Sequence, residues 1–127
     1  MTRASSKLEA LADQLRAAVE ELSGRFGDNA EITRDGQVDC DPRRPGHIVR
    51  WEYNVKVPAR PGAAELLANV VVPGMRESGW DVTNRDSARE FAVQFSQRGS
   101  YLGVHIARSG GHDVVIGGST PCVAVRR

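Results

Sequence analysis

Two alternating segments joined by a short turn constrain the fold more than any other feature. Apolar and polar residues alternate from Glu90 to Ser96 and again from Tyr101 to Ala107, on either side of Gln97-Arg-Gly-Ser100. Successive side chains of a strand point to opposite faces, so each segment is predicted to be a strand with one buried face. A hairpin closed on that turn would pair three apolar positions of each strand: Phe95 with Leu102, Val93 with Val104 and Phe91 with Ile106.

Three further segments have a regular period. Apolar residues recur at helical spacing from Leu8 to Phe26, which predicts an amphipathic helix. The segment from Ile48 to Val57 alternates strictly and predicts another half-buried strand. A second helix is predicted from Pro61 to Gly79, with Trp80 packing back against its end. Pro73 lies inside this pattern and predicts a kink, because proline has no backbone N–H to donate.

The remaining segments are short. Residues 28–45 are rich in turn formers and leave room only for a short strand at Glu31–Thr33, whereas Val114–Ile116 and Val123–Val125 are predicted to complete the sheet. Amphipathic helices and half-polar strands are both satisfied when the helices cover one face of the sheet. We therefore expect a single α+β domain over residues 1–127, a two-layer sandwich with two helices packed on one face of a mostly antiparallel sheet of four to five strands.

The inward positions of these elements predict one core, because a two-layer domain brings the apolar faces of helices and strands into contact. We expect the following residues to be buried together: Leu11, Leu15, Val19, Leu22, Trp51, Leu66, Leu67, Val70, Phe91, Val93, Phe95, Val104 and Ile106.

Composition and motifs argue against several function classes. The chain has 127 residues and a formal net charge of +1, which disfavours a dedicated nucleic-acid binder. No apolar run is long enough to predict a transmembrane segment. The histidines (His47, His105 and His112) and the two cysteines lack the spacing of metal ligands, so we expect no metal site and no cofactor. The G-x-S-x-G pattern of a serine nucleophile is absent.

Cys40 and Cys122 are the only cysteines, and both have turn-rich neighbours, in Asp-Cys-Asp and Thr-Pro-Cys-Val. Two unrelated buried thiols would be the ordinary interpretation for a cytoplasmic protein. A small core residue is less expected in such irregular surroundings than a covalent anchor, so we favour a disulfide. The bridged Cα atoms would then lie within about 7 Å of each other, near one end of the sheet.

The outward face of the predicted hairpin is the candidate binding surface. Small residues there leave the strand backbone poorly covered, and an amphipathic aromatic and a titratable ring stand beside them. Such a shallow floor could receive a flat ligand or a partner's loop without catalytic machinery. Two alternatives stay open: residues 28–46 fold over this face and fill it, or His105 is catalytic with Glu90 as its orienting carboxylate. The candidate ligand-binding residues are Arg50, Glu90, Ala92, Tyr101, Gly103 and His105.

Five runs, taken in their order, carry a resemblance to a known family. They are Leu8 to Phe26, Asp35-Gly-Gln-Val-Asp-Cys40, Arg50-Trp-Glu-Tyr53, Glu77-Ser-Gly-Trp80-Asp81 and Gly118-Ser-Thr-Pro-Cys-Val123. With these runs the chain resembles the soluble part of small actinobacterial cell-envelope lipoproteins of the LppA-like kind. The resemblance implies a disulfide between Cys40 and Cys122 and no catalytic residues. Such lipoproteins carry a leader and a lipid-modified cysteine; either these precede the sequence as given, or the chain is a cytoplasmic relative.

These observations favour a non-catalytic binding or interaction module of the cell envelope, whose partner would be a protein or an envelope component. The competing hypotheses are a cytoplasmic accessory or immunity-type protein that docks to one partner, and a small enzyme that uses His105 and Glu90. We expect an extracytoplasmic or envelope location if a leader has been removed, and the cytoplasm otherwise. Since disulfides persist in oxidising compartments, free thiols would favour the accessory protein.

Overall fold

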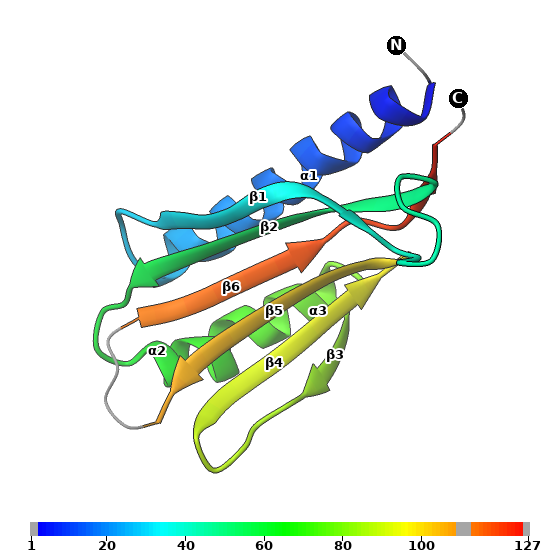
Figure 1. Cartoon of the computed structure of the whole chain (residues 1–127). Helices are drawn as coiled ribbons and strands as arrows, with labels where there is room; N and C mark the ends of the chain where they lie inside the picture. Colours follow the sequence, from blue (N-terminus) through cyan, green and yellow to red (C-terminus); the bar gives the residue numbers. More distant parts are fainter. Residues whose placement is uncertain (1–2, 109–112, 126–127) are drawn as a thin grey trace.

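The computed structural model describes residues 3–108 and 113–125, which form two helical segments and one open antiparallel sheet (Figure 1). The predicted α+β class is confirmed, but the sheet has seven strands rather than four to five. The expectation missed the full length of one edge strand and the presence of the short strand Asp81–Asn84, whereas the short strand predicted at Val123–Val125 is present as Val123–Ala124. The elements in chain order are α1 (Arg3–Phe26), β1 (Glu31–Asp39), β2 (Ile48–Pro58), α2 (Ala63–Leu66), the π-helical η1 (Leu67–Val71), α3 (Val72–Glu77), β3 (Asp81–Asn84), β4 (Glu90–Gln97), β5 (Ser100–Ala107), β6 (Asp113–Ser119) and β7 (Val123–Ala124).

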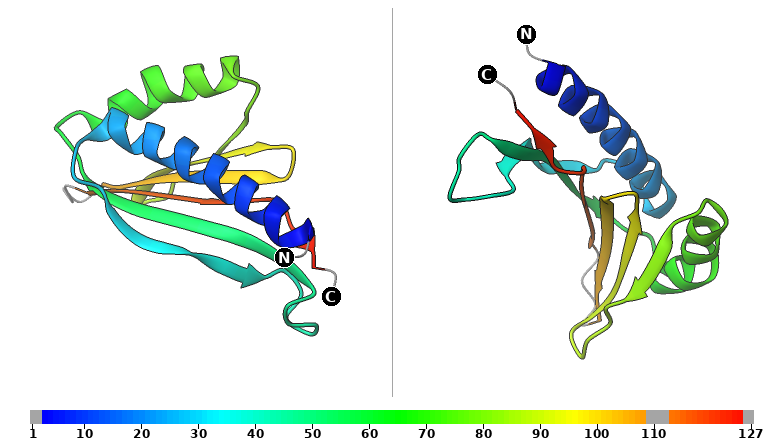
Figure 2. Two further views of the ribbon diagram at one scale, coloured as in Figure 1. Left: turned by 90° about the horizontal axis from the view of Figure 1, so that it is seen from above. Right: turned by 90° about the vertical axis from the view of Figure 1, so that its right-hand side faces the viewer.

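The strands are arranged in the order β1-β2-β6-β5-β4-β3, and β7 pairs with β2 beyond the end of β6. Helix α1 lies against β2 and β6, and α3 lies against β3. Both helical segments are on the same side of the sheet (Figure 2). The opposite side, which carries no helix within the described residues, is called the outer face below.

The central hairpin has the predicted register. Phe91 pairs with Ile106, Val93 with Val104 and Phe95 with Leu102. The loop itself is tighter than expected, because Gln97 and Ser100 are still paired and only Arg98 and Gly99 form the turn. Both turn residues have positive φ, at 48° and 84°, as the right-handed twist of a two-residue hairpin requires.

The second helical segment runs without a break from Ala63 to Glu77, with the π-helical turn Leu67–Val71 in its middle. A π-helical turn holds more residues than an α-helical turn, so it shifts the phase of the buried side. Leu67 and Val71 are therefore buried, while Val70, which was predicted in the core, is 48% exposed. Pro73 follows in the first turn of α3, where a missing N–H is tolerated. The π-helical turn thus ends two positions before the proline at which a kink was predicted, and the kink itself stays a prediction.

The end of this segment forms a Schellman motif. In this motif a residue with left-handed backbone conformation follows the helix, and the N–H groups there donate to carbonyls of the last helical turn. Gly79 has a φ of 88°, and its N–H donates to the carbonyl of Arg76 (3.0 Å). The N–H of Trp80 donates to the carbonyl of Met75 (3.0 Å). Trp80 is partly buried against the core, as the sequence predicted.

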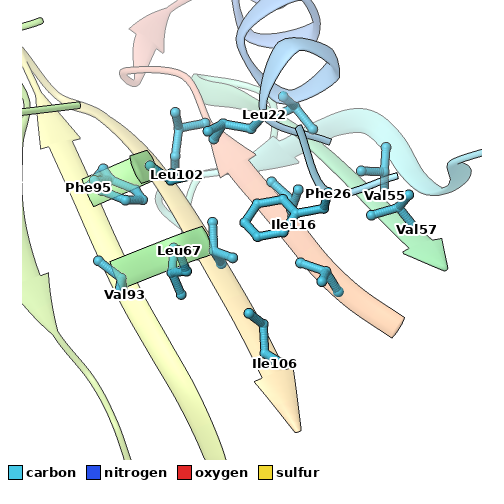
Figure 3. Packing of buried hydrophobic residues seen from close by; sticks show 14 of the residues in the cluster. Leu22, Phe26, Val55, Val57, Leu67, Val93, Phe95, Leu102, Ile106 and Ile116 are labelled. Atoms are coloured by element: carbon cyan, nitrogen blue, oxygen red, sulfur yellow. The ribbon is translucent and has the colours of Figure 1, made fainter. Parts of the chain in front are cut away.

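The core lies between the helices and the inner face of the sheet (Figure 3). Of the predicted core residues, Leu15, Val19, Leu22, Leu67, Val93, Phe95, Val104 and Ile106 are buried. Others are only partly buried at the margin of the core, namely Leu11, Trp51, Leu66 and Phe91. The core also takes in the end of α1 and the middle of β2 and β6, with Phe26, Tyr53, Val55, Val57, Val114 and Ile116 each at most 2% exposed.

Polar contacts fasten α1 to the first two strands. Arg16 donates to both carboxylate oxygens of Asp35 (Nε, 3.1 and 3.3 Å), and its guanidinium lies 5.1 Å from the ring centre of Trp51. Trp51 Nε1 donates to the same carboxylate (2.7 Å). Burial alone would raise the pKa of Asp35, but the hydrogen bonds from Arg16 and Trp51 outweigh it and lower that pKa. Asp35 is thereby a charged anchor between helix and sheet.

Candidate functional site

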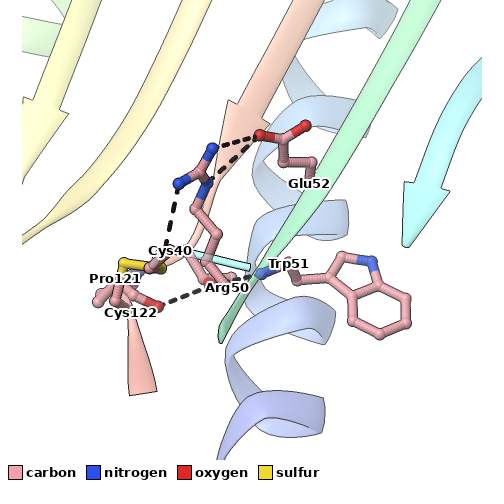
Figure 4. The surroundings of a disulfide bond; sticks show 7 residues. Cys40, Arg50, Trp51, Glu52, Pro121 and Cys122 are labelled. Atoms are coloured by element: carbon pink, nitrogen blue, oxygen red, sulfur yellow. Dashed lines mark hydrogen bonds and ion pairs between the residues drawn. A yellow bond between two sulfur atoms is a disulfide. The ribbon is translucent and has the colours of Figure 1, made fainter. Parts of the chain in front are cut away.

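Cys40 and Cys122 form a disulfide with a Cα–Cα distance of 6.3 Å (Figure 4), as predicted. Cys40 directly follows β1, where its N–H donates to the carbonyl of Ile48 (2.8 Å). Cys122 lies in the interruption between β6 and β7. Strand β1 pairs with β2 on one side and β7 pairs with it on the other. The disulfide therefore links these two neighbours of β2 at one end of the sheet.

The interruption between β6 and β7 is built by Thr120 and Pro121. Thr120 is 3% exposed, and its Oγ1 accepts the N–H of Trp51 (2.9 Å) while its own N–H donates to the Trp51 carbonyl (3.0 Å). Pro121 has no N–H and cannot continue the ladder. The side chain of Thr120 therefore accepts the hydrogen bond of a β2 N–H group at the point where β6 ends. The interruption after β6 places Cys122 next to Cys40.

The outer face is hollowed over β5 and β6. This outer hollow has a volume of about 320 Å³. Its floor is the directly paired Gly103 and Gly117. Its walls are polar or amphipathic side chains from four strands and the end of β3: Glu52, Asn54, Arg85, Gln94, Tyr101, His105 and Ser119.

The hollow exists because its floor has no side chains. A Cβ at Gly103 would come 3.3 Å from Nε2 of His105, and one at Gly117 would come 2.6 Å from Oδ1 of Asn54. The imidazole and the amide therefore lie over the two glycines, in space that any larger residue would fill. Glycine inside a strand weakens the strand and often marks a close approach of another group.

A second hollow, also of about 320 Å³, lies beside the first toward the disulfide. This disulfide-side hollow is lined by Arg50, Gly99, Thr120 and Cys122, and it shares Gln94, Tyr101 and Ser119 with the outer hollow. Tyr101 stands between the two and is 47% exposed.

His105 and Glu90 are in contact, as the sequence analysis proposed. Nδ1 of His105 lies 3.1 Å from Oε1 of Glu90, and the two side chains are 46% and 39% exposed. When Nδ1–H donates to the carboxylate, Nε2 of the neutral ring is left as an acceptor above Gly103. Ala92 pairs with His105 but is only 1% exposed, so its side chain is covered rather than open.

The charged walls are already partly paired. Glu52 accepts from Arg50 (Nη2, 2.9 Å) and from Arg34 (Nε, 3.0 Å), so two guanidinium groups surround one carboxylate (Figure 4 shows the Arg50 pair). Arg50 also points Nη1 toward Sγ of Cys40 (4.0 Å). Arg85 donates from Nε to Oε1 of Gln94 (3.2 Å). It forms no ion pair with any residue in the described part of the chain.

The predicted residues are therefore divided among neighbouring places. Tyr101, Gly103 and His105 line the outer hollow, and Arg50 lines the disulfide-side hollow with Tyr101. Glu90 holds His105 from the side, and Ala92 lies beneath. Their role in binding stays a prediction.

Sequence reasoning did not select Asn54, Gln94, Arg85 or Gly117 as candidate binding residues, although alternation places Gln94 on the outward face of the hairpin. The sequence signal that could have pointed to this surface was Gly117, a glycine inside the last long strand, β6. The alternative in which residues 28–46 cover this face is wrong, because Glu31–Asp39 extends the sheet sideways as β1 instead.

Within residues 3–108 and 113–125, no three His, Cys, Asp or Glu side chains converge as a metal site would require. His112 lies outside the described residues. None of the helices that the structure describes is long and apolar enough to cross a membrane.

No family model, curated protein or solved structure matches the chain. The evidence for a function is therefore the arrangement of this chain's own residues.

Proposed function

We propose that the protein is a non-catalytic binding or interaction module that receives its ligand on the outer face, at the outer hollow. The observation that carries this proposal is the glycine floor of Gly103 and Gly117 beneath polar walls. An ordinary solvated sheet face would have large polar side chains at those two positions. With glycine there, the imidazole of His105 and the amide of Asn54 lie low over the floor, and the hollow that they line stays open for a ligand group.

Unused hydrogen-bonding capacity supports the proposal. The phenol of Tyr101 and the amide nitrogen of Gln94 make no side-chain hydrogen bond to another described residue, although both line the hollows. These groups are hydrated when no ligand is bound. A ligand that replaces their water molecules gains orientation from them, while the floor supplies contact area.

The disulfide supports an extracytoplasmic setting, because such bonds persist mainly in oxidising compartments. We therefore propose a cell-envelope module similar to the actinobacterial lipoproteins named above, with an envelope component or a protein as the partner. Both cysteines are in the bond, which disfavours the cytoplasmic accessory or immunity-type protein.

The contact between His105 and Glu90 is the one observation that favours the alternative of a small enzyme. A histidine oriented by a carboxylate can act as a general base. Both groups are well exposed, however, and no Ser or Cys side chain among the described residues forms a hydrogen bond with the ring. We therefore keep a binding role for His105 as the leading proposal.

The proposal is tested by filling the floor. Gly103→Val keeps a residue suited to strands but places a branched side chain where the His105 ring now lies. Gly36→Val on β1 is the matched control, because a Cβ at Gly36 meets nothing within 4 Å and Gly36 lines neither hollow. Both variants should give folded NMR spectra.

The measurement is amide chemical-shift mapping with three soluble probes: tetragalacturonate, chitotetraose and tetraglutamate. We expect at least one probe to shift the amides of Gly103, His105 and Gly117, to lose binding with Gly103→Val and to keep it with Gly36→Val. Shifts confined to the helical layer, or equal binding by both variants, would contradict the proposal.

A further inference from the structure

We infer that the outer hollow and the disulfide-side hollow form one groove for a carboxylate-bearing oligosaccharide. This inference rests on the proposed function and names the chemical class of its ligand. It is carried by the continuity of the two hollows, the balance of charge on their walls and the excess of hydrogen-bond donors.

The two hollows are continuous because Gln94, Tyr101 and Ser119 line both of them. Arg50 on β2 stands at one end, and Arg85, just after β3, stands at the other. Three strands separate β2 from β3, so these residues are about 19 Å apart across the sheet at the usual strand spacing. A single small ring would reach only one of them, whereas an extended chain of rings would reach both.

The charges that face the groove are Glu52, Arg50, Arg85 and His105. The carboxylate of Glu52 is held between Arg34 and Arg50, so this group of three side chains has an excess positive charge. Glu90 is the carboxylate beside His105. Arg85, which has no ion-pair partner in the described residues, adds a second positive charge. Three guanidinium groups thus stand against the two carboxylates of Glu52 and Glu90, and this excess of one positive charge favours an anionic ligand over a neutral one.

Hydrogen-bond donors also outnumber acceptors. Both oxygens of Glu52 already accept from arginines, and Oε1 of Gln94 accepts from Arg85. What is left includes the amide nitrogen of Gln94, the phenol of Tyr101 and the free guanidinium nitrogens, all of which can donate. Such a surface fits a ligand with carboxylate, ring and hydroxyl oxygens.

An oligosaccharide fits this face better than a peptide does. The backbone groups of central strands are used within the sheet, so recognition here must come from side chains alone. Extended peptides usually bind at a sheet edge, where main-chain groups are unpaired. Planar amide and guanidinium groups can instead bind the oxygens of a sugar, and its apolar ring face can lie on the exposed ring of Tyr101.

The three probes separate these possibilities. Tetragalacturonate has four sugar rings with a carboxylate on each, chitotetraose has four neutral rings, and tetraglutamate has the carboxylates on a peptide. We expect tetragalacturonate to bind at the groove at least about tenfold more tightly than either of the others, and to weaken as salt rises from about 0.02 M to about 0.5 M.

The matched variants are Arg85→Gln and Arg25→Gln. Arg25 is a half-exposed arginine on α1 that lines neither hollow. Arg85→Gln should weaken tetragalacturonate binding about tenfold, as expected for loss of a charge-assisted contact, and Arg25→Gln should leave it unchanged.

Each of the other binding results would contradict one named part of the inference. If chitotetraose bound as tightly as tetragalacturonate or more tightly, the charge argument would be wrong. If tetraglutamate did so, the ligand class would be an acidic peptide and not an oligosaccharide. The proposed function would stand in both cases. If no probe shifts the outer face, the proposed function and this inference both fail.

Discussion

Removal of the disulfide should cost this domain a large part of its stability. The bond joins residues 82 positions apart, so it greatly restricts the denatured chain. The chain-entropy relation gives a contribution of about 4.5 kcal/mol for a loop of this length, which we take as an upper value. Cys122 is exposed and Cys40 is half-buried, so serine at both positions opens no cavity that would add to the loss.

The double variant Cys40→Ser/Cys122→Ser should therefore unfold with a free energy about 3 to 4.5 kcal/mol below that of the parent. At the usual unfolding entropy for a chain of 127 residues, this loss lowers the Tm by roughly 15 °C. Urea denaturation followed by tryptophan fluorescence measures it, because Trp51 and Trp80 both pack against the core.

The reduced parent is the control and should unfold like the double variant, which itself should not respond to reductant. The urea m-value should rise in the variant, since its denatured chain exposes more surface. A variant within about 1 kcal/mol of the oxidised parent would show that the long loop is not what the bond restrains.

Three further substitutions test the packing and the charges. Phe95→Ala should cost about 3 to 5 kcal/mol in denaturation experiments because Phe95 is fully buried, and a loss below about 1 kcal/mol would contradict its place in the core. Gly79→Ala should cost about 1 to 2 kcal/mol, since alanine disfavours a φ of 88°; Gly24→Ala, in open space on α1, should not destabilise. Asp35→Asn should reduce the loss of stability in acid: the lowered pKa of Asp35 stabilises the fold above the unfolded value of about 3.9, and this gain disappears as pH falls through the folded pKa. Parallel pH–stability curves for Asp35→Asn and the parent would contradict that assignment.

The hairpin register could be predicted because its information is local. Alternation fixes which side chains of β4 and β5 are buried, and the turn length fixes which of them meet. The capping of α3 was equally local, since Gly79 and Trp80 are adjacent to the helix they close.

The edge strand β1 could not be predicted over its full length. Asp35-Gly36 in its middle is a strong turn signal, and the strand has no apolar alternation. Its conformation comes from main-chain pairing with β2, and Asp35 is held by Arg16 and Trp51, which are distant in sequence. The π-helical turn is a similar case, because a helical wheel with constant spacing cannot anticipate the shift from Val70 to Val71.

The candidate site was predictable within the central hairpin, where the contact of Glu90 with His105 follows from the register, and on β2 only at Arg50. Tyr101, Gly103 and His105 share a face of β5 by simple alternation. Asn54 and Gly117 join them through the pairing of β2 with β6 and of β6 with β5, and no local pattern specifies the first of these pairings. The glycine floor therefore requires β5 and β6 side by side, and its Asn54 wall requires β2 beside them as well.

The central position of β6 has a consequence for how the chain folds. Apart from β7, the sheet consists of two units whose paired strands are consecutive in the sequence: the strand pair β1–β2 and the meander β3–β4–β5–β6. They meet only where β2 pairs with β6 and β7, and forming this seam requires closure of a long loop, which is slow. The bond between Cys40 and Cys122 holds one end of the seam together even in the denatured chain. We therefore expect the oxidised chain to refold faster than the reduced chain, in which the pairing of β2 with β6 would be the rate-limiting step.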